Sequence, residues 1–267
     1  MRVLLTNDDG IFAKGIETLY LALQTEHDVI VVAPETEQSA VGHAITMMDP
    51  LRVNAVNRNG SFFGYALNGT PADCVKLAVT ELLKPPPQVV VSGINMGANV
   101  GVNVIYSGTV SAATEGTLLG IPSIAVSLDA FASTNFEPAA AFILHLTRQV
   151  ERFGLPPGVL LNVNVPNIPQ EQIRGVRVTR QGEAKFLDHY DRRVDPRNHV
   201  YYWLCGSIQS PDPDTDTDAF AIAANYISVT PIHYDLTNYG MLETLRQWPL
   251  ESVHDTDSQP ATVSHTL

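Results

Sequence analysis

The fold is decided by the stretch Arg2-Val3-Leu4-Leu5-Thr6-Asn7-Asp8-Asp9-Gly10. It begins as a short β-rich apolar run and turns polar at Asn7. Apolar residues then recur at the spacing of a helix, at Ile16, Leu19, Tyr20 and Leu23. A second apolar run, Asp28 to Ala33, follows and is closed by Pro34. A strand, a helix and another strand in this order predict a βαβ unit with parallel strands and a right-handed crossover.

The same alternation continues as far as about Arg180. Further strands are expected at residues 88–92, 123–127 and 159–165. Further helices are expected at residues 70–83, 107–120 and 138–153. Thr70 is the expected N-cap of the first of these helices and Pro71 its first residue. The repeated order predicts an α/β fold: a doubly wound, Rossmann-like, mainly parallel sheet.

After about Arg180 the alternation fails, and a C-terminal β-hairpin extension is expected. Residues 199–204 and 225–230 are typical of strands. We therefore expect residues 1–180 to form the α/β catalytic core, and residues 181–250 to form a β-hairpin and oligomerisation extension that closes back on the core. The polar stretch 251–267 has no periodicity, which predicts a disordered tail.

Composition limits the classes of function. The chain has 267 residues and a formal net charge of −12, which argues against a broad surface for nucleic acid or for an anionic membrane. A small anionic substrate is still compatible, because a metal ion and backbone amides create a local anion site. No apolar stretch approaches the ~20 residues of a membrane span, and the sequence turns polar at Asn7, too early for a signal peptide. A cytoplasmic protein is expected.

The acidic pair Asp8 and Asp9 follows the first strand directly. Two carboxylates this close repel each other unless a cation neutralises them, so the pair favours a metal site or a raised pKa. Oxygen ligands of this kind select Mg²⁺, Ca²⁺ or Mn²⁺ over zinc. Taken alone, the pair is equally typical of an acidic helix start, with one Asp as cap and the other solvated.

Polar loops follow other predicted strands and should meet this pair, because ligands bind at the carboxyl ends of parallel strands. Ser39 lies in the loop 34–42, and a serine oxygen is a weak but adequate ligand beside two carboxylates. Asn95 lies in the Gly/Asn loop 93–103, and an asparagine carbonyl is a neutral hard ligand. Each loop alone is weak evidence, since the same residues also make ordinary turns. His43 is near a strand start and is more typical of a structural histidine than of a catalytic one.

The helix expected from Ser107 offers a seat for phosphate. Free amides and the helix dipole attract anions at a helix N-terminus, and the hydroxyls of Ser107 and Thr109 flank Gly108 there. Simple capping by Ser and Thr explains the same residues equally well. The sequence has no nucleophile elbow, Walker motif or dinucleotide-binding motif, so a water activated by a metal is the more natural nucleophile.

These loops, taken in order, resemble a known family. The stretches that carry the resemblance are Leu4–Gly10, Ala33–Ser39 with Thr46, Asn68–Val75, Ser92–Asn95, Tyr106–Val110, Asn162–Pro166, Thr217–Asp218 and Ser228–Pro231. Together they are similar to the SurE-type survival proteins, the stationary-phase 5′-nucleotidases. Any one stretch is unremarkable, but the ordered set covers most of the chain and is specific.

The resemblance implies a metal-dependent phosphatase that hydrolyses nucleoside monophosphates, with 3′-nucleotides and short polyphosphate as further substrates. It implies one divalent ion per subunit, Mg²⁺ or Mn²⁺, held by Asp8, Asp9, Ser39 and Asn95. Asp8, Asp9 and Asn95 are then the expected catalytic residues. It also implies homodimers or homotetramers that exchange C-terminal segments.

Two other classes of function fit some of the same residues. A metal-dependent glycosidase or nucleoside hydrolase also places an Asp cluster after its first strand, but it frees base from ribose and releases no phosphate. A nucleotide-binding module without catalysis would use the helix N-terminus and turn nothing over. The preferred base, the physiological metal and the identity of any general base are not determined by the sequence.

Overall fold

The computed structural model describes residues 1–130, 135–208 and 214–250. Within this part, Met1–Tyr234 form one compact unit and the remaining described residues belong to a second, which holds the helix α6 (Tyr239–Arg246). The predicted tail 251–267 lies outside the described residues. The predicted boundary at residue 180 stays a prediction. None of the helices in the described ranges is long and apolar enough to cross a membrane.

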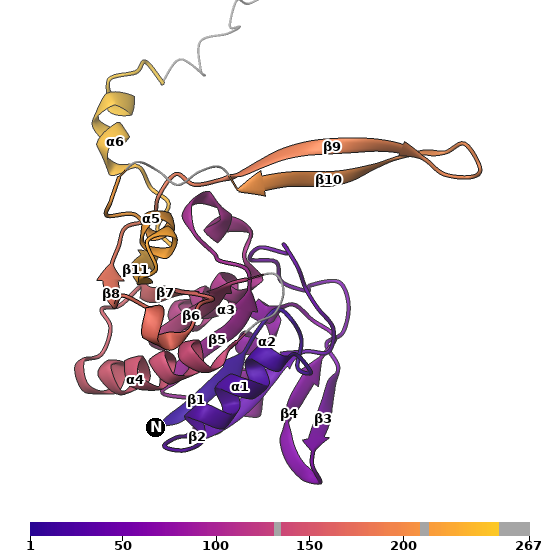
Figure 1. The fold of residues 1–267 in the computed structure, drawn as a ribbon, viewed down its shortest axis with the longest axis vertical. Coiled ribbons are helices and arrows are strands. Elements are labelled where there is room, and N and C mark those ends of the chain that lie inside the picture. The colour runs from indigo at the N-terminus through magenta and orange to yellow at the C-terminus, as the bar shows by residue number, and fades with distance from the viewer. Residues whose placement is uncertain (131–134, 209–213, 251–267) are drawn as a thin grey trace, which may run out of the picture. The chain divides into compact units, whose positions relative to one another are not determined.

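In the described part of the first unit, a nine-stranded sheet forms the centre (Figure 1). In spatial order its strands are β3 (Val53–Arg58), β4 (Ser61–Leu67), β2 (Asp28–Pro34), β1 (Arg2–Thr6), β5 (Val89–Met96), β6 (Ser123–Asp129), β7 (Val159–Pro166), β11 (Ile227–His233) and β8 (Val176–Val178). The pairs β3–β4 and β7–β11 are antiparallel, and the other neighbours are parallel. The predicted α/β fold with a mainly parallel sheet is confirmed.

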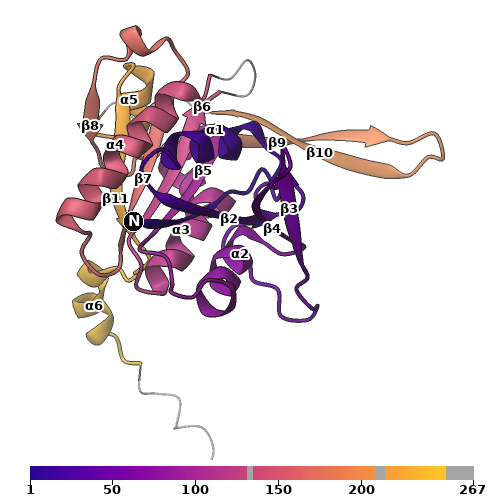
Figure 2. The same cartoon turned by 90° about the horizontal axis from the view of Figure 1, so that it is seen from below.

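Helices cover both faces of this sheet (Figure 2). The helical elements of the unit are α1 (Lys14–Leu23), α2 (Pro71–Leu77) with the π-turn Ala78–Leu82, the 3-10 turn Gly101–Tyr106, α3 (Gly108–Leu118), α4 (Glu137–Phe153), the 3-10 turn Gln170–Gln172 and α5 (Asp218–Ala223). Alternate side chains of β1 decide the two faces, since a strand points successive side chains to opposite sides. Val3 and Leu5 pack in the core with α1 and α4, whereas Leu4 packs with α2 and α3.

The C-terminal hairpin is present but is built from other strands than predicted. Its strands are β9 (Phe186–Val194) and β10 (Val200–Ile208), which pair with each other in a separate antiparallel sheet. The prediction of a strand at residues 199–204 therefore holds, but its partner β9 was missed. The run expected at residues 225–230 was wrongly placed in the hairpin, because β11 pairs with β7 and β8 in the main sheet.

Candidate metal and phosphate site

A cavity of about 280 Å³ opens beside the carboxyl end of β1. Four of the residues predicted from the sequence line it: Asp8, Ser39, Asn95 and Ser107. They come from four separate segments that the sheet topology brings together, because β1 lies between β2 and β5 and all three strands run in parallel. The predicted convergence of the strand-end loops is therefore what the structure shows.

Asp8 is buried, and the first turn of helix α3 donates hydrogen bonds to its carboxylate. The Thr109 amide donates to Asp8 Oδ2 over 3.0 Å, and the Thr109 hydroxyl donates to Asp8 Oδ1. Burial raises the pKa of Asp8, and these hydrogen bonds oppose the rise. A side chain at Gly108 would not fit, since a Cβ there would lie 2.8 Å from the Asp8 Cβ. The sequence Ser107-Gly108-Thr109 thus lets the helix start directly against the carboxylate.

Asp9 is the second member of the acidic pair. Burial and the negative charge of Asp8 raise its pKa to about 7, although a hydrogen bond from the Met96 backbone opposes the rise. Among the ion pairs of the described residues, none joins Asp8 or Asp9 to a Lys or Arg. The site therefore concentrates negative charge that a bound cation would neutralise.

Ser39 and Asn95 add neutral oxygen atoms from two flanking loops. Ser39 follows β2, and its hydroxyl donates to a Glu37 carboxylate oxygen, which leaves the lone pairs of Oγ for a ligand. Asn95 lies near the end of β5, and its Nδ2 donates to the Gly97 carbonyl over 2.7 Å. This bond fixes the amide so that Oδ1 is the atom left for a ligand.

The residues fit a hard divalent cation. Two carboxylates whose pKa values burial raises, an amide oxygen and a hydroxyl are the donor types that Mg²⁺ and Mn²⁺ prefer. The part of the chain that the structure describes contains no group of three or more His, Cys, Asp or Glu side chains that could hold a metal ion. A zinc-type cluster of His and Cys is therefore not found there, and a cation at this cavity depends on the neutral oxygens of Ser39 and Asn95.

At the phosphate-binding site predicted at the start of α3, Ser107 and Thr109 make different contacts. Ser107 lines the cavity and is also the N-cap, since its Oγ accepts from the Val110 amide over 3.1 Å. The first-turn amides that follow it have no partner within the helix. Thr109 differs, because both its amide and its hydroxyl already donate to Asp8. The capping alternative is thus realised at Ser107, and Thr109 orients the carboxylate.

A buried amide network holds the loop after Asn95, and the sequence analysis did not identify it. The Asn99 amide donates to Asn164 Oδ1 over 2.7 Å, while the Asn99 carbonyl accepts from Nδ2 of both Asn162 and Asn164. Asn99 Nδ2 donates to Ser127 Oγ over 2.8 Å. The alternation Asn162-Val163-Asn164 in a buried strand was the available signal, because polar side chains two residues apart share one face.

A buried carboxylate, Asp218, holds the same loop at its next turn. Asp218 is fully buried at the start of α5 and accepts backbone N–H groups from Gly101, Gly182 and Ala219 at 2.8–3.0 Å. The Ala184 carbonyl accepts from the Val102 amide over 2.9 Å. The segment that leads into β9 therefore packs directly against a loop that lines the cavity.

The sequence matches the family described as survival protein SurE over residues 3–188. The chain is 68% identical over 250 residues to a protein of Syntrophobacter fumaroxidans named 5′-nucleotidase SurE, an alignment that covers 94% of this chain and 100% of that one. A protein of Syntrophus aciditrophicus with the same name is 51% identical over 247 residues, which are 92% of this chain and 93% of its own.

A solved structure gives the same result for the fold. The crystal structure of the SurE protein from Aquifex aeolicus superposes with a TM-score of 0.81 at 39% sequence identity, and the match covers 92% of this chain and 98% of that one. The similarity therefore extends over nearly the whole of both chains, including regions beyond the residues that form the cavity.

Proposed function

Because this chain belongs to the SurE family of survival proteins, we propose that it is a metal-dependent phosphatase that hydrolyses nucleoside 5′-monophosphates to nucleoside and phosphate. The reaction class is supported by two relatives, 68% and 51% identical, that are named 5′-nucleotidase. We include 3′-nucleotides and short polyphosphate as further substrates. They present the same terminal phosphoryl group to the cavity.

The observation that carries the proposal is the acidic pair beside a helix N-terminus. Asp8 and Asp9 hold one divalent cation, Mg²⁺ or Mn²⁺, together with Ser39 and Asn95. When bound, this cation supplies positive charge to the phosphoryl group and activates a water for attack on phosphorus. No cationic side chain among the described residues takes this place beside the pair.

The chain's own residues bind and orient the substrate. The Ser107 hydroxyl and the Gly108 amide, at the positive end of the α3 dipole, donate to phosphate oxygens. Thr109 supports this arrangement from behind, because it holds both oxygens of Asp8. One carboxylate of the pair can accept the proton that the attacking water loses. Tyr106, which lines the cavity and is 60% exposed, offers an apolar wall for the nucleoside.

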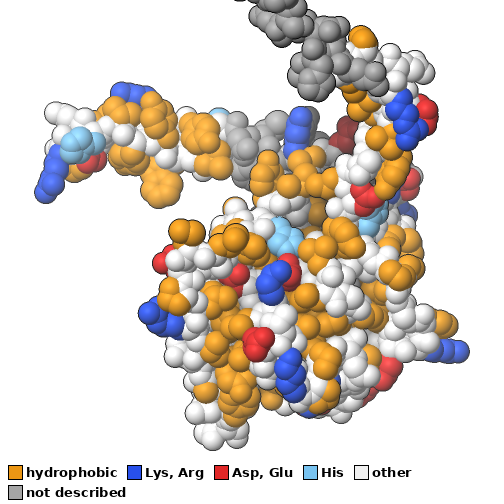
Figure 3. Space-filling view, turned by 180° about the vertical axis from the view of Figure 1, so that it is seen from behind, with side chains coloured by type: hydrophobic (Ala, Val, Ile, Leu, Met, Phe, Trp, Pro, Cys, Tyr) orange, Lys and Arg blue, Asp and Glu red, His pale blue; other side chains and the backbone are white. Residues whose placement is uncertain are grey.

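We further propose that the chain works as a homodimer or homotetramer joined through the β9–β10 hairpin. Large apolar side chains on this hairpin are exposed, among them Tyr190 (69%), Tyr202 (58%), Trp203 (57%) and Leu204 (57%) (Figure 3). Exposed apolar side chains gathered on one element are typical of an interface. Size-exclusion chromatography with light scattering of the full chain tests this, and a monomer would contradict it.

The activity is tested by phosphate release from AMP with Mg²⁺ or Mn²⁺, with and without chelator. Asp8→Asn and Asn95→Ala should each lower kcat/KM by at least about 100-fold, because the first removes a negative charge beside the cation and the second removes a cation ligand. Asp49→Asn is the matched control, since Asp49 is exposed and does not line the cavity. Release of free base without phosphate would indicate a nucleoside hydrolase instead. Binding of AMP without turnover would indicate a non-catalytic module.

A further inference from the structure

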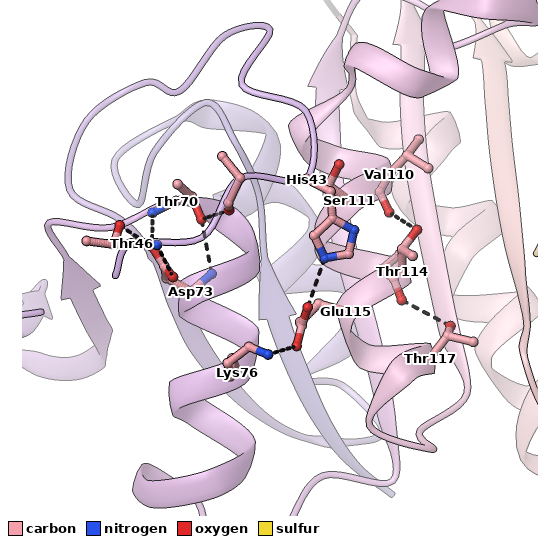
Figure 4. A network of polar contacts seen from close by, with 12 residues as sticks. His43, Thr46, Thr70, Asp73, Lys76, Val110, Ser111, Thr114, Glu115 and Thr117 are labelled. Carbon is pink, nitrogen blue, oxygen red and sulfur yellow. Dashed lines mark hydrogen bonds and ion pairs between the residues drawn. The ribbon is translucent and has the colours of Figure 1, made fainter. Parts of the chain in front are cut away.

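Helix α3 carries a buried carboxylate that the proposed chemistry does not use. Glu115 is 2% exposed and lies between His43 and Lys76, two side chains from other elements (Figure 4). Its Oε2 is 2.8 Å from Nε2 of His43, and its Oε1 is 2.8 Å from Nζ of Lys76. Burial alone would raise the pKa of Glu115, but the hydrogen bonds from His43 and Lys76 outweigh burial and keep this pKa below its usual value.

The two partners of Glu115 differ in what they are attached to. Lys76 belongs to helix α2, which packs against α3 on the same face of the sheet and contributes no residue to the lining of the cavity. His43 belongs to the loop of residues 35–52, which joins β2 to β3 and carries Ser39. His43 follows Ser39 by four residues. Glu115 therefore ties the Ser39 loop to the same helix whose first turn faces the cavity.

Backbone hydrogen bonds hold this loop on either side of Ser39. Before Ser39, the Gln38 amide donates to the Asp8 carbonyl over 2.8 Å. After it, the Gly42 amide donates to the Tyr106 carbonyl over 3.1 Å. Further on, Asp73 of α2 accepts from the amide and the hydroxyl of Thr46. Ser39 itself is exposed. His43, four residues further on, provides a side-chain contact from this loop to Glu115 of α3 (Figure 4).

We propose that Glu115 is a positioning residue: through His43 it holds the loop that carries Ser39 against helix α3, so that the Ser39 hydroxyl reaches the cation. The inference rests on the proposed function for its metal ion. In this proposal His43 is neither a metal ligand nor a general acid. Its contact with Glu115 determines how tightly Ser39, the third side chain of the metal site, is held.

The test measures Mn²⁺ binding directly, by titration calorimetry or by loss of the free Mn²⁺ signal in electron paramagnetic resonance. His43→Ala should weaken Mn²⁺ binding by about tenfold, the lower end of the effect of a residue that orients a ligand. His43→Gln should recover part of the loss, since its amide can still donate to Glu115. Saturating Mn²⁺ should restore the kcat for AMP in both variants.

Two controls separate positioning from general stabilisation. Lys76→Met removes the other partner of the same carboxylate, and it should leave the Mn²⁺ affinity within about twofold even where it lowers the melting temperature. In a double-mutant cycle, His43→Ala should cost nothing further once Ser39→Ala is present, because the two changes act on one contact. Melting temperatures of all variants identify any that fail to fold.

The outcomes are distinguishable. If His43→Ala leaves the Mn²⁺ affinity unchanged, or Lys76→Met weakens it equally, Glu115 only stabilises the fold and the inference is wrong. An additive cycle with Ser39→Ala also overturns it. If the unmodified chain binds Mn²⁺ but releases no phosphate from AMP, the proposed function fails while the positioning result stands. If it binds no Mn²⁺, both fail.

Discussion

Two loops bring neutral oxygen donors to one cavity, and they are held in opposite ways. In each loop the anchoring side chain follows the donor by four residues: His43 follows Ser39, and Asn99 follows Asn95. The imidazole of His43 is 32% exposed and contacts the charged carboxylate of Glu115, whereas Asn99 is 8% exposed and bonds with neutral groups of β6 and β7.

This difference between the contacts of His43 and Asn99 determines how firmly Ser39 and Asn95 are fixed before a ligand binds. A buried polar network is costly to disturb, because every group that loses its partner is left desolvated. The partly exposed imidazole of His43 can exchange its bond with Glu115 for one with water, because Glu115 then still keeps Lys76 as a partner. We therefore expect the Asn95 loop to be preformed, and the Ser39 loop to adjust when the cation binds.

The largest expected effect comes from removing the deepest anchor of the Asn95 loop. Asp218→Ala leaves the amides of Gly101, Gly182 and Ala219 without their buried acceptor, which should cost about 4 kcal/mol of unfolding free energy. Urea unfolding measures the loss. Asp216→Ala is the matched control, since this nearby carboxylate is 66% exposed and pairs with Arg180, and it should cost less than about 1 kcal/mol. Equal losses for both variants would mean that the Asn95 loop is not held as described.

A smaller effect is expected from pH, which changes the protonation of the acidic pair that lies beside both loops. The pKa of Asp9 is raised from 3.8 to about 7, so the folded chain without metal binds a proton that the unfolded chain has lost. The unfolding free energy of the metal-free chain, compared with Asp9→Asn, should therefore fall as pH rises from about 4 to about 7. Mn²⁺ must displace this proton, so its affinity should fall by up to about tenfold per pH unit below pH 7.

The control for pH is a variant outside the acidic pair. Asn164→Ala should show the same pH slope of Mn²⁺ affinity as the unmodified chain, because this side chain does not titrate and does not belong to the acidic pair. A slope that weakens in Asp9→Asn and persists in Asn164→Ala supports the assignment. A pH-independent Mn²⁺ affinity in the unmodified chain would contradict the raised pKa of Asp9.

The convergence of the site was predictable because it follows from topology. Parallel strands place their carboxyl ends along one edge, so Asp8, Ser39 and Asn95 could be expected to meet once β1, β2 and β5 were recognised. The orientation of Thr109 was not predictable in this way. It depends on how closely the start of α3 approaches Asp8. The packing of Gly108 against the Asp8 carboxylate allows this close approach.

Strand β9 and the buried pair Asn162 and Asn164 were not predicted from the sequence. Both lack the usual pattern of apolar core residues alternating with polar surface residues. Strand β9 alternates weakly, since Asp188, Asp191 and two arginines interrupt it, and it pairs with β10 in a sheet separate from the main sheet, whose core imposes alternation on its own strands. Asn162 and Asn164 have the opposite difficulty. They are polar and fully buried, and their alternation marks only a shared face of the strand, not the distant loop with which they pair.

The smallest expected effect is that of salt, and it separates the two anchors most directly. Added salt screens the charge of the Glu115 carboxylate where water reaches its contact with His43, but it hardly affects a buried network of neutral amides. Salt lowers Mn²⁺ affinity in every variant, so the informative quantity is the ratio of affinities between the unmodified chain and each loop variant. From 0.05 to about 0.5 M NaCl, the ratio for His43→Ala should shrink by about twofold, while the ratio for Asn164→Ala should stay constant. If both ratios respond alike, the Ser39 loop is held as rigidly as the Asn95 loop. The difference between the His43 and Asn99 contacts then has no effect on Mn²⁺ binding.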